Sequence, residues 1–342
     1  MARRPTIADL ARASGVSVAT VDRVLNRRLP VREATAMSVV AAAERIGFHA
    51  TGLLKQRLAE VPHRDLGFIL QKRHDEFYRS LAAALSTATR EASYMRGRPT
   101  VEFVDELIPA AIAAKLRDMA RHCDALAVVA VDHPHVNEAI EELSAAGTPV
   151  YALLTDVSAP SRAGYAGVDS RKAGRTAAWA ISRLAKEPGP VGVLVGTHRY
   201  LGQELAEISF RSYFREHAPD FRLLETVVDL EDDRIAHEAT LEILAKNKNL
   251  KGIYLAGGGM KGMIGALREE GGGRQIVAVC NELLSHTRTA LIDGVVDLVL
   301  NTPLAQLSAR VVEAMGRAVD GKALEGIEQI QLPAELVIRE NI

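Results

Sequence analysis

Several short apolar runs of the sequence end in side chains that can bind a small polar molecule. The runs are LGFILQ, ALAVVAV, IVAVC and VDLVL, and the side chains that follow them are Asp75, Phe77, Tyr78, Asp132, His133, Asn281 and Asn301. Carboxylates and amides accept or donate hydrogen bonds in pairs, which suits vicinal hydroxyls, and an aromatic ring suits the apolar face of a sugar. The pattern favours a binding site for a polyhydroxylated small molecule.

The spacings that catalysis needs are missing from the sequence. The glycine run 257–259 has no Lys-Ser or Lys-Thr after it and predicts a tight turn, not a phosphate loop. Neither H-E-x-x-H nor G-x-S-x-G occurs. Cys123 and Cys280 lie far apart, and we expect both to be buried thiols in a reducing compartment. We therefore expect a protein that is not an enzyme and has no metal or cofactor.

The elements that must position these side chains alternate between strands and helices over residues 63–342. Apolar strand runs begin at residues 66, 101, 125, 149, 191, 223, 252, 276 and 296, with helical stretches between them. This alternation predicts an α/β domain with parallel sheets that helices cover on both faces. Ligands of such sheets bind at the carboxyl ends of the strands, where the side chains named above lie.

Charge divides the chain into a basic beginning and an acidic remainder. Residues 1–60 carry ten Lys/Arg and five Asp/Glu, a net charge of +5, whereas the rest carries 32 and 38, a net charge of −6. A small basic module on a mildly acidic body suits phosphate-backbone binding by one end alone. The beginning has no apolar signal segment, and no apolar run reaches the length of a membrane span, so we expect a cytoplasmic protein without a membrane partner.

Three short helices are predicted within residues 1–48. Thr6 and Asp9 form a capping pattern for a first helix, which Gly15 ends. Ser17 caps a second helix that reaches Asn26, and a third covers about residues 32–46. Two short helices joined by a glycine-centred turn form a helix-turn-helix, so these residues are predicted to be a DNA-binding headpiece.

The residues of this segment resemble the lactose-repressor (LacI/GalR) family of transcription regulators. The run A-x-x-x-G-V-S-x-x-T-V-x-R-V-L-N, from Ala11 to Asn26, is a long and specific match, and P-x-x-L-V-I-R-E, from Pro333 to Glu340, resembles the family's C-terminal signature. The resemblance implies a sequence-specific DNA-binding repressor. It also implies that residues 63–342 form a two-lobed domain, similar to periplasmic binding proteins, that binds an effector and dimerises.

The family resemblance assigns DNA contacts to the second helix and its surroundings. Val18 and Ala19 would face base edges in the major groove, and Arg23 would reach a guanine. The implied phosphate contacts are Thr6, Ser17, Thr20 and Asn26. Asp22 departs from the family's usual small polar residue, which leaves the operator preference open.

Residues 49–62 correspond to the family's hinge helix, which places a leucine from each subunit in the minor groove. By position, Leu58 would be this wedge and Lys55 a phosphate contact. The usual Pro-Asn before the helix is replaced by Ala50 and Thr51. A plain linker helix therefore remains an alternative.

The effector site departs from its sugar-binding relatives in two places. The helix after VGVLVG lacks the usual arginine and carries Glu204 and Glu207 instead, and the Asn-Asp pair expected after GIYLAG is replaced by Gly259-Met260. We therefore expect an effector other than a common hexose, such as a polyol or an aminated sugar.

The expected partners are pseudo-palindromic operator DNA, the effector and a second copy of the chain, in a dimer or a tetramer. The expected role is a repressor of a carbohydrate or polyol utilisation operon. A nucleoside or nucleobase effector is the alternative within the same class, and a solute-binding protein that does not bind DNA is the alternative outside it. The sequence does not distinguish induction from corepression.

Overall fold

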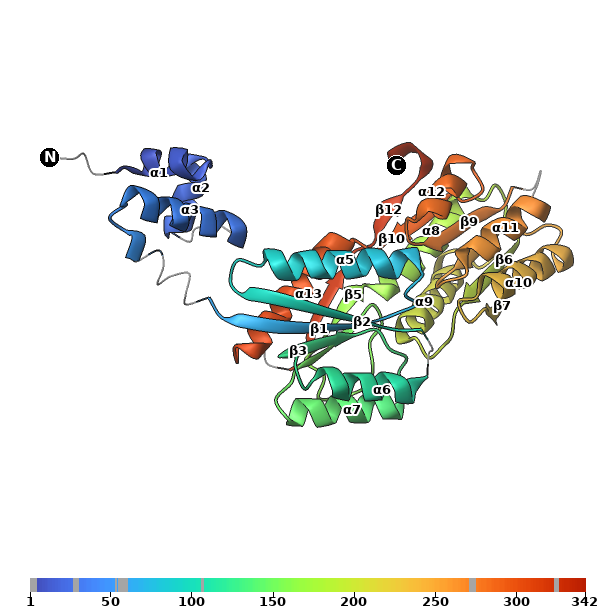
Figure 1. Ribbon diagram of the computed structural model, residues 1–342. Helices are drawn as coiled ribbons and strands as arrows, with labels where there is room; N and C mark the ends of the chain where they lie inside the picture. The colour runs from blue at the N-terminus through green and yellow to red at the C-terminus, as the bar shows by residue number, and fades with distance from the viewer. Residues whose placement is uncertain are drawn as a thin grey trace.

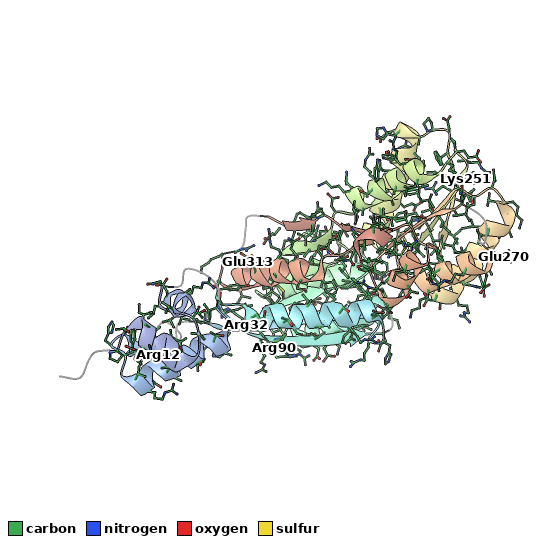
Figure 2. The ribbon with its side chains drawn as sticks, turned by 90° about the horizontal axis from the view of Figure 1, so that it is seen from above. Arg12, Arg32, Arg90, Lys251, Glu270 and Glu313 are labelled. Carbon is green, nitrogen blue, oxygen red and sulfur yellow. The ribbon has the colours of Figure 1, made fainter. Side chains whose placement is uncertain are left out.

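The computed structural model describes residues 5–26, 31–52, 54, 61–105, 108–270, 275–322 and 326–342. Its N-terminal part is a headpiece of three helices: α1 (Ile7–Ser14), α2 (Val18–Asn26) and α3 (Glu33–Ile46). Figure 1 shows the headpiece beside a much larger body, and in Figure 2 the labelled Arg12 and Lys251 lie toward opposite ends of the molecule.

Local side-chain chemistry sets the boundaries of the first two helices. Thr6 and Asp9 form a capping box at the start of α1, and Gly15 ends the helix in the left-handed region with φ 71°. The backbone N–H of Thr20 donates to the Ser17 hydroxyl at 3.1 Å, so Ser17 caps α2. The predicted helix-turn-helix is confirmed.

The headpiece has one small apolar core, which all three helices share. Leu10, Val21 and Val39 are each fully buried in it. Leu54, only 2% exposed, packs into the same core. The packed headpiece thus includes a residue of the segment that the sequence assigned to a linker or hinge.

The body consists of two lobes, each built on a six-stranded sheet. The first sheet has the order β11-β5-β4-β3-β1-β2, and all of its neighbouring strands are parallel. Its strands are β1 (His63–Gln71), β2 (Arg96–Val104), β3 (Ala125–Val128), β4 (Val150–Leu153), β5 (Gly164–Val168) and β11 (Glu328–Leu332). Helices α5 (Glu76–Glu91) and α13 (Leu304–Val319) cover one face, and α6 (Pro109–Met119) and α7 (Pro134–Ala145) cover the other.

The second sheet has the order β12-β10-β9-β8-β6-β7. Its strands are β6 (Pro190–Val195), β7 (Arg222–Val228), β8 (Gly252–Leu255), β9 (Val277–Asn281), β10 (Leu298–Asn301) and β12 (Glu335–Val337). Helices α8 (Ser170–Leu184) and α9 (Leu201–His217) pack on one face, and α10 (Asp233–Lys246), α11 (Met260–Glu270) and α12 (Ser285–Ile292) pack on the other.

The fold class is as predicted, with differences at single strands. The edge strand β12 runs antiparallel to β10, and a short 3-10 helix, Arg339–Asn341, follows it. Strands β5 and β11 were not expected from the sequence, and both belong to the first sheet. None of the helices among the described residues is long and apolar enough to cross a membrane.

The chain passes between the lobes three times. It crosses after β5, where α8 begins the second lobe, and returns after β10, where α13 packs on the first lobe. It crosses again between β11 and β12. The two lobes are therefore joined by three short segments near residues 169, 303 and 334, and the backbone N–H of Asp169 donates to the Leu332 carbonyl at 2.9 Å between the first and the third.

Candidate functional site

The start of α2 presents the residues that the sequence assigned to base contacts. Val18 is 52% exposed, and Ala19 and Arg23 are exposed as well. Val21, on the opposite side of α2, is fully buried in the headpiece core. One face of α2 is therefore fixed by packing while the other is free for a partner, as a recognition helix requires.

The residues assigned to phosphates surround this face. Thr6 and Ser17 lie at the N-caps of α1 and α2, and the hydroxyls of Ser17 and Thr20 are 2.9 Å apart. The Asn26 side-chain amide donates to Asp22 at 2.7 Å, so one oxygen of the Asp22 carboxylate already has a partner. Predicted contacts Lys55 and Leu58 lie outside the described residues.

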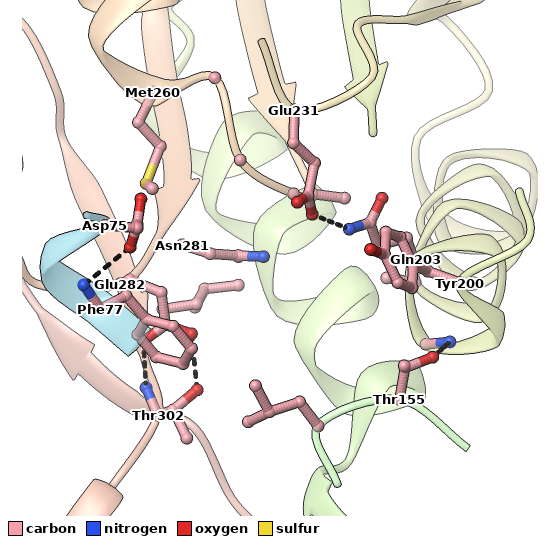
Figure 3. A pocket seen from close by; sticks show the side chains of 18 of the residues that line it. Asp75, Phe77, Thr155, Tyr200, Gln203, Glu231, Met260, Asn281, Glu282 and Thr302 are labelled. Carbon is pink, nitrogen blue, oxygen red and sulfur yellow. Dashed lines mark hydrogen bonds between the residues drawn. The ribbon is translucent and has the colours of Figure 1, made fainter. Parts of the chain in front are cut away.

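A cavity of about 610 Å³ lies between the two lobes of the body. The first lobe contributes Asp75 and Phe77, at the start of α5, and Thr155, just after β4. The second lobe contributes residues such as Tyr200 and Glu231 (Figure 3). The cavity therefore lies at the carboxyl ends of both sheets, where open α/β sheets bind ligands.

Aromatic rings form one wall of the cavity. The Phe77 and Tyr78 rings meet edge to face, with centroids 5.3 Å apart and an interplanar angle of 77°. The hydroxyls of Tyr78 and Tyr200 both donate to the side-chain oxygen of the buried Gln71, at 3.2 and 2.8 Å. Since Tyr78 is on the first lobe and Tyr200 on the second, Gln71 joins the lobes beneath the cavity.

Charged and polar pairs join the lobes beside this wall. The Lys72 ammonium lies 2.9 Å from the Glu231 carboxylate, whose other oxygen accepts from Gln203 at 2.8 Å. On α12, the backbone N–H and the hydroxyl of Ser285 donate to the two oxygens of Glu76 on α5, at 3.0 and 2.6 Å. Closure of the cavity is thus supported by contacts within the chain.

Glu282 places a second carboxyl group at the cavity. Its two oxygens accept from the hydroxyl and backbone N–H of Thr302, at 2.6 and 3.2 Å. Burial raises its pKa to about 7, partly offset by these hydrogen bonds. The neighbouring Asn281 side chain points into the cavity (Figure 3), and its oxygen is buried without a hydrogen-bond partner among the described residues.

Left-handed backbone recurs at the cavity. Four non-glycine residues with positive φ line it: Lys72, Leu154, Glu231 and Glu282, with φ between 44° and 65°. Each follows a strand, and each conformation costs free energy that the surrounding structure must offset. Such strain is typical of places where a protein holds functional side chains in fixed directions.

The structure brings together four of the nine residues that the sequence assigned to the effector. Asp75, Phe77, Tyr78 and Asn281 line the cavity. The other five are not among its lining residues: Asp132, His133, Glu204, Glu207 and Asn301.

Four of the five have side-chain partners elsewhere. Asp132 accepts from Asn137 and Ser158, because β3 ends at Val128 and the chain has left the sheet before it reaches Asp132. The His133 ring caps α7.

The other three predicted residues, Glu204, Glu207 and Asn301, lie on the second lobe and also point to other parts of the structure or lie just beside the cavity. The Glu207 carboxylate pairs with Arg211 at 2.8 Å and with His198 at 2.8 Å. Asn301 accepts from the backbone of Leu283 and donates to Glu335 on the antiparallel edge strand. Glu204 lies on α9 one residue beyond Gln203, which does line the cavity.

Sequence reasoning missed several lining residues. They are Lys72, Thr155, Tyr200, Gln203, Glu231 and Glu282. Two of them had a usable signal, since Lys72 directly follows the first apolar strand and Glu282 directly follows Asn281. The role of Gln203 depends on which face of α9 meets the lobe junction, which the sequence does not show.

The geometry defines a class: a two-lobed α/β ligand-binding domain that carries a three-helix DNA-binding headpiece. Comparison with known families agrees, because residues 66–323 match the periplasmic binding protein domain and residues 6–50 match the lacI family of bacterial regulatory proteins. The chain belongs to the LacI/GalR family of regulators with a periplasmic-binding-protein-like domain.

Curated relatives match over part of their length. The HTH-type transcriptional regulator GalR of Salmonella typhimurium is 34% identical over 92 residues, 27% of this chain and 25% of GalR. The HTH-type transcriptional regulator MalR of Streptomyces coelicolor is 26% identical over 203 residues, 57% of this chain and 55% of MalR. The chain thus spans about a quarter and about half of these relatives.

Solved structures share the fold of the body. A solute-binding protein of Agrobacterium vitis bound to α-D-tagatopyranose superposes with a TM-score of 0.74 at 18% identity, over 81% of this chain and 95% of that protein. One from Actinobacillus succinogenes bound to D-allose has a TM-score of 0.73 at 17% identity, over 81% and 98%.

Proposed function

We propose that the protein is a transcription regulator, specifically a repressor of a carbohydrate or polyol utilisation operon, controlled by a small polyhydroxylated effector. The observation that carries the proposal is the combination of an exposed α2 face on a basic headpiece with a cavity of about 610 Å³ between the lobes of the body. The protein acts on DNA in the cytoplasm and is not an enzyme.

The relatives support both halves of this proposal. GalR and MalR are transcriptional regulators by name, and the solute-binding structures hold sugars in domains of the same fold. In this chain, the side chains of Asp75 and Asn281 offer hydrogen-bond acceptors and the Phe77 ring offers an apolar face at the cavity. These groups suit a molecule with several hydroxyls on a compact carbon frame.

The mechanism follows from the connection between the lobes. A dimer would place two headpieces on the half-sites of a pseudo-palindromic operator, with Arg23 of each reading a guanine. An effector that binds across the cavity prefers one relative orientation of the lobes and shifts the population toward it. A coupling of about 1–3 kcal/mol changes operator affinity roughly 5- to 150-fold.

A nucleoside or nucleobase effector is the second candidate, and ring geometry distinguishes it. A flat base is held best between parallel aromatic planes, whereas Phe77 and Tyr78 meet at 77°. This arrangement favours a ring with an apolar face and a hydroxylated edge over a base. A solute-binding role without DNA is disfavoured by the headpiece, since its helix-turn-helix would have no use.

An electrophoretic mobility-shift assay tests the proposal. The full chain is mixed with DNA from upstream of its own gene at two salt concentrations, with and without a panel of sugars, polyols and nucleosides. We expect salt-dependent binding that at least one sugar or polyol changes. Failure to bind DNA at any salt concentration would contradict the regulator, and a response to nucleosides alone would favour the second candidate.

Matched variants locate the interface in the same assay. Arg23→Ala is expected to weaken operator binding, whereas Arg121→Ala, an exposed cation on the first lobe, is expected to leave it unchanged. Equal loss in both variants would indicate nonspecific attraction of the chain to DNA.

A further inference from the structure

The charges that line the cavity differ between its solvent-exposed part and its interior. Asp233, Arg234 and Lys261 are exposed, and Asp232 is engaged as the N-cap of α10, where it accepts from two backbone N–H groups. These two carboxylates and two cations cancel in net charge. The net charge of the cavity is therefore set by the less exposed groups.

Among the described interior residues, three carboxyl groups face one ammonium. The carboxyls are those of Asp75, Glu231 and Glu282, and the ammonium is that of Lys72. Lys72 is paired with Glu231 at 2.9 Å, so its charge is neutralised within the chain. Asp75 and Glu282 remain without a cation.

The hydrogen bonds of these two carboxyls confirm that no described cation compensates them. One Asp75 oxygen accepts from the backbone N–H groups of Phe77 and Tyr78, at 2.8 and 3.4 Å. Both Glu282 oxygens accept from Thr302 alone. Asp75 and Glu282 lie near enough for Asp75 to add to the burial that raises the Glu282 pKa. A cation between the two groups would stabilise the ionised Asp75 and would favour the ionised form of Glu282, whose pKa is raised to about 7 without such a partner.

The walls of the cavity also suit a cation. Phe77, Tyr78 and Tyr200 line it, and the electron-rich face of an aromatic ring attracts an ammonium group. In the interior of the cavity an anion would meet no free described cation, because Lys72 is already paired with Glu231 and the other lining cations, Arg234 and Lys261, lie in the exposed part.

A separate observation shows that the cavity holds polar groups in need of a partner. The Tyr254 side chain is fully buried, lines the cavity, and its hydroxyl has no hydrogen-bond partner among the described residues. The side-chain oxygen of Asn281 and both ring nitrogens of His286 share that condition. Buried polar groups without partners are rare in folded proteins, so these are places for ligand hydroxyls.

We propose that the effector carries a protonated amine beside its hydroxyls, and that Asp75 and Glu282 bind this ammonium. The inference rests on the proposed function, since it names the chemical class of the effector of the same cavity. Amino sugars and amino polyols fit, whereas the two interior carboxyl groups disfavour an acidic or phosphorylated group in the interior of the cavity. Tyr254, Asn281 and His286 are left for the hydroxyls.

Matched ligand pairs test the charge directly. The full chain is titrated calorimetrically and melted with glucosamine against glucose, galactosamine against galactose, mannosamine against mannose and glucamine against glucitol. We expect at least one amine to bind ten times more tightly than its neutral partner. A neutral partner that binds as tightly as its amine, or a panel without any preference for an amine, would overturn the proposal.

A conservative variant separates recognition from folding. Asp75→Asn keeps a good N-cap for α5 and removes only the charge, so the chain should fold. We expect it to lose at least tenfold in affinity for the preferred amine, with little change for neutral sugars. Asp220→Asn, an exposed carboxylate after α9, is the matched control and should change neither. Undiminished amine preference in Asp75→Asn would overturn the assignment.

The same protein sample distinguishes this inference from the proposed function. If the chain binds operator DNA and a neutral sugar is the ligand that changes this binding, the proposal of an aminated effector is wrong and the proposed regulator function is retained. If the chain binds the amine tightly but never binds DNA, the proposed function fails while the cavity assignment survives.

Discussion

The headpiece and the body assemble their functional residues in opposite ways. In the headpiece, Val18, Ala19 and Arg23 lie within two turns of one helix, and the remaining face of that helix is buried. In the body, the lining runs from Lys72 to Ala334 and comes from both lobes. A local surface can be read from a local motif, whereas a cavity depends on where distant strand ends meet.

The apolar cores of the headpiece and the body also differ, in size and in number. The described headpiece has a single small cluster around Leu10, Val21 and Val39, while the body has four clusters, two on each sheet. A folded domain of about 50 residues has a free energy of unfolding of only roughly 3–7 kcal/mol. The headpiece therefore depends on each of its few buried side chains far more than the body does.

The largest effect is expected when a fully buried leucine is replaced by alanine, once in the headpiece and once in the body. Leu10→Ala and Leu85→Ala each empty a fully buried site and cost about 2–5 kcal/mol. In the headpiece this approaches the total stability, so operator binding should be lost while the body still melts cooperatively. Leu85→Ala should lower the melting temperature of the body and keep the headpiece folded. Calorimetry with mobility shifts measures both.

The independence of the two regions fails if Leu10→Ala also lowers the melting temperature of the body. It fails equally if Leu85→Ala abolishes operator binding at a temperature at which the body is folded.

A large pH effect is expected in the body. Asp229 is fully buried, and burial raises its pKa to about 7, although the hydrogen bond from the Glu231 backbone N–H opposes the rise. Between about pH 4 and pH 7 the folded state keeps a proton that the unfolded chain releases, so stability should fall as the pH rises. The shift from 3.8 to about 7 corresponds to roughly 4 kcal/mol.

Asp229→Asn should remove the Asp229 part of this slope and leave the part from Glu282, whose pKa is also raised to about 7, as chemical denaturation between pH 4 and pH 8 would measure. Asp220→Asn, exposed on the same lobe, should keep it. An unchanged slope in Asp229→Asn would assign the pH dependence to other groups.

An intermediate effect is expected at the reading face. If Arg23 makes the proposed bidentate base contact, worth about 1–3 kcal/mol, Arg23→Ala should lower operator affinity roughly 5- to 150-fold. Because Arg23 is exposed, the melting temperature should stay the same. A mobility shift on operators altered at single bases measures this, and affinity that falls equally on every sequence would assign Arg23 to the phosphate backbone.

The smallest effect is expected at the contact between the lobes. Ser285→Ala removes the hydroxyl that donates to Glu76 at 2.6 Å, while the backbone N–H contact remains. A hydrogen bond of this kind contributes about 0.5–1.5 kcal/mol, so effector affinity should fall two- to tenfold. Ser182→Ala, whose hydroxyl bonds only within α8, is the control. Equal effects in the two variants would remove Ser285 from the closing contacts.

Sequence patterns predicted most of the fold, and the exceptions have physical reasons. Strand β5, GYAGV, has two glycines and reads poorly as a strand. In the structure, a Cβ at Gly164 would lie 2.5 Å from the backbone oxygen of Glu328, and one at Gly167 would lie 2.2 Å from the Tyr165 hydroxyl. Gly164 is needed because the neighbouring strand β11 approaches closely, and Gly167 because the Tyr165 side chain of the same strand lies over it, and only the tertiary structure shows either contact.

Only part of the candidate site could be predicted from the sequence, because its residues depend on where each strand ends in the folded sheet. Asp75 and Asn281 follow strands that end where the apolar pattern ends, so their positions could be predicted. Asp132 was misplaced because the apolar pattern continues to Val131, beyond the last paired residue, Val128. Glu231 lies in a run of acids in which the sequence alone does not separate a helix cap from a cavity residue.

The three crossings between the lobes have a consequence for synthesis on the ribosome. The first lobe begins at His63, yet α13 and β11, which complete its core and its sheet, are made only after the whole of β6–β10. Leu307 and Val311 belong to the same buried core as Phe68, which lies far earlier in the chain. The nascent first lobe must therefore wait with an open sheet edge while the second is translated, and that edge is exposed to aggregation until the chain returns.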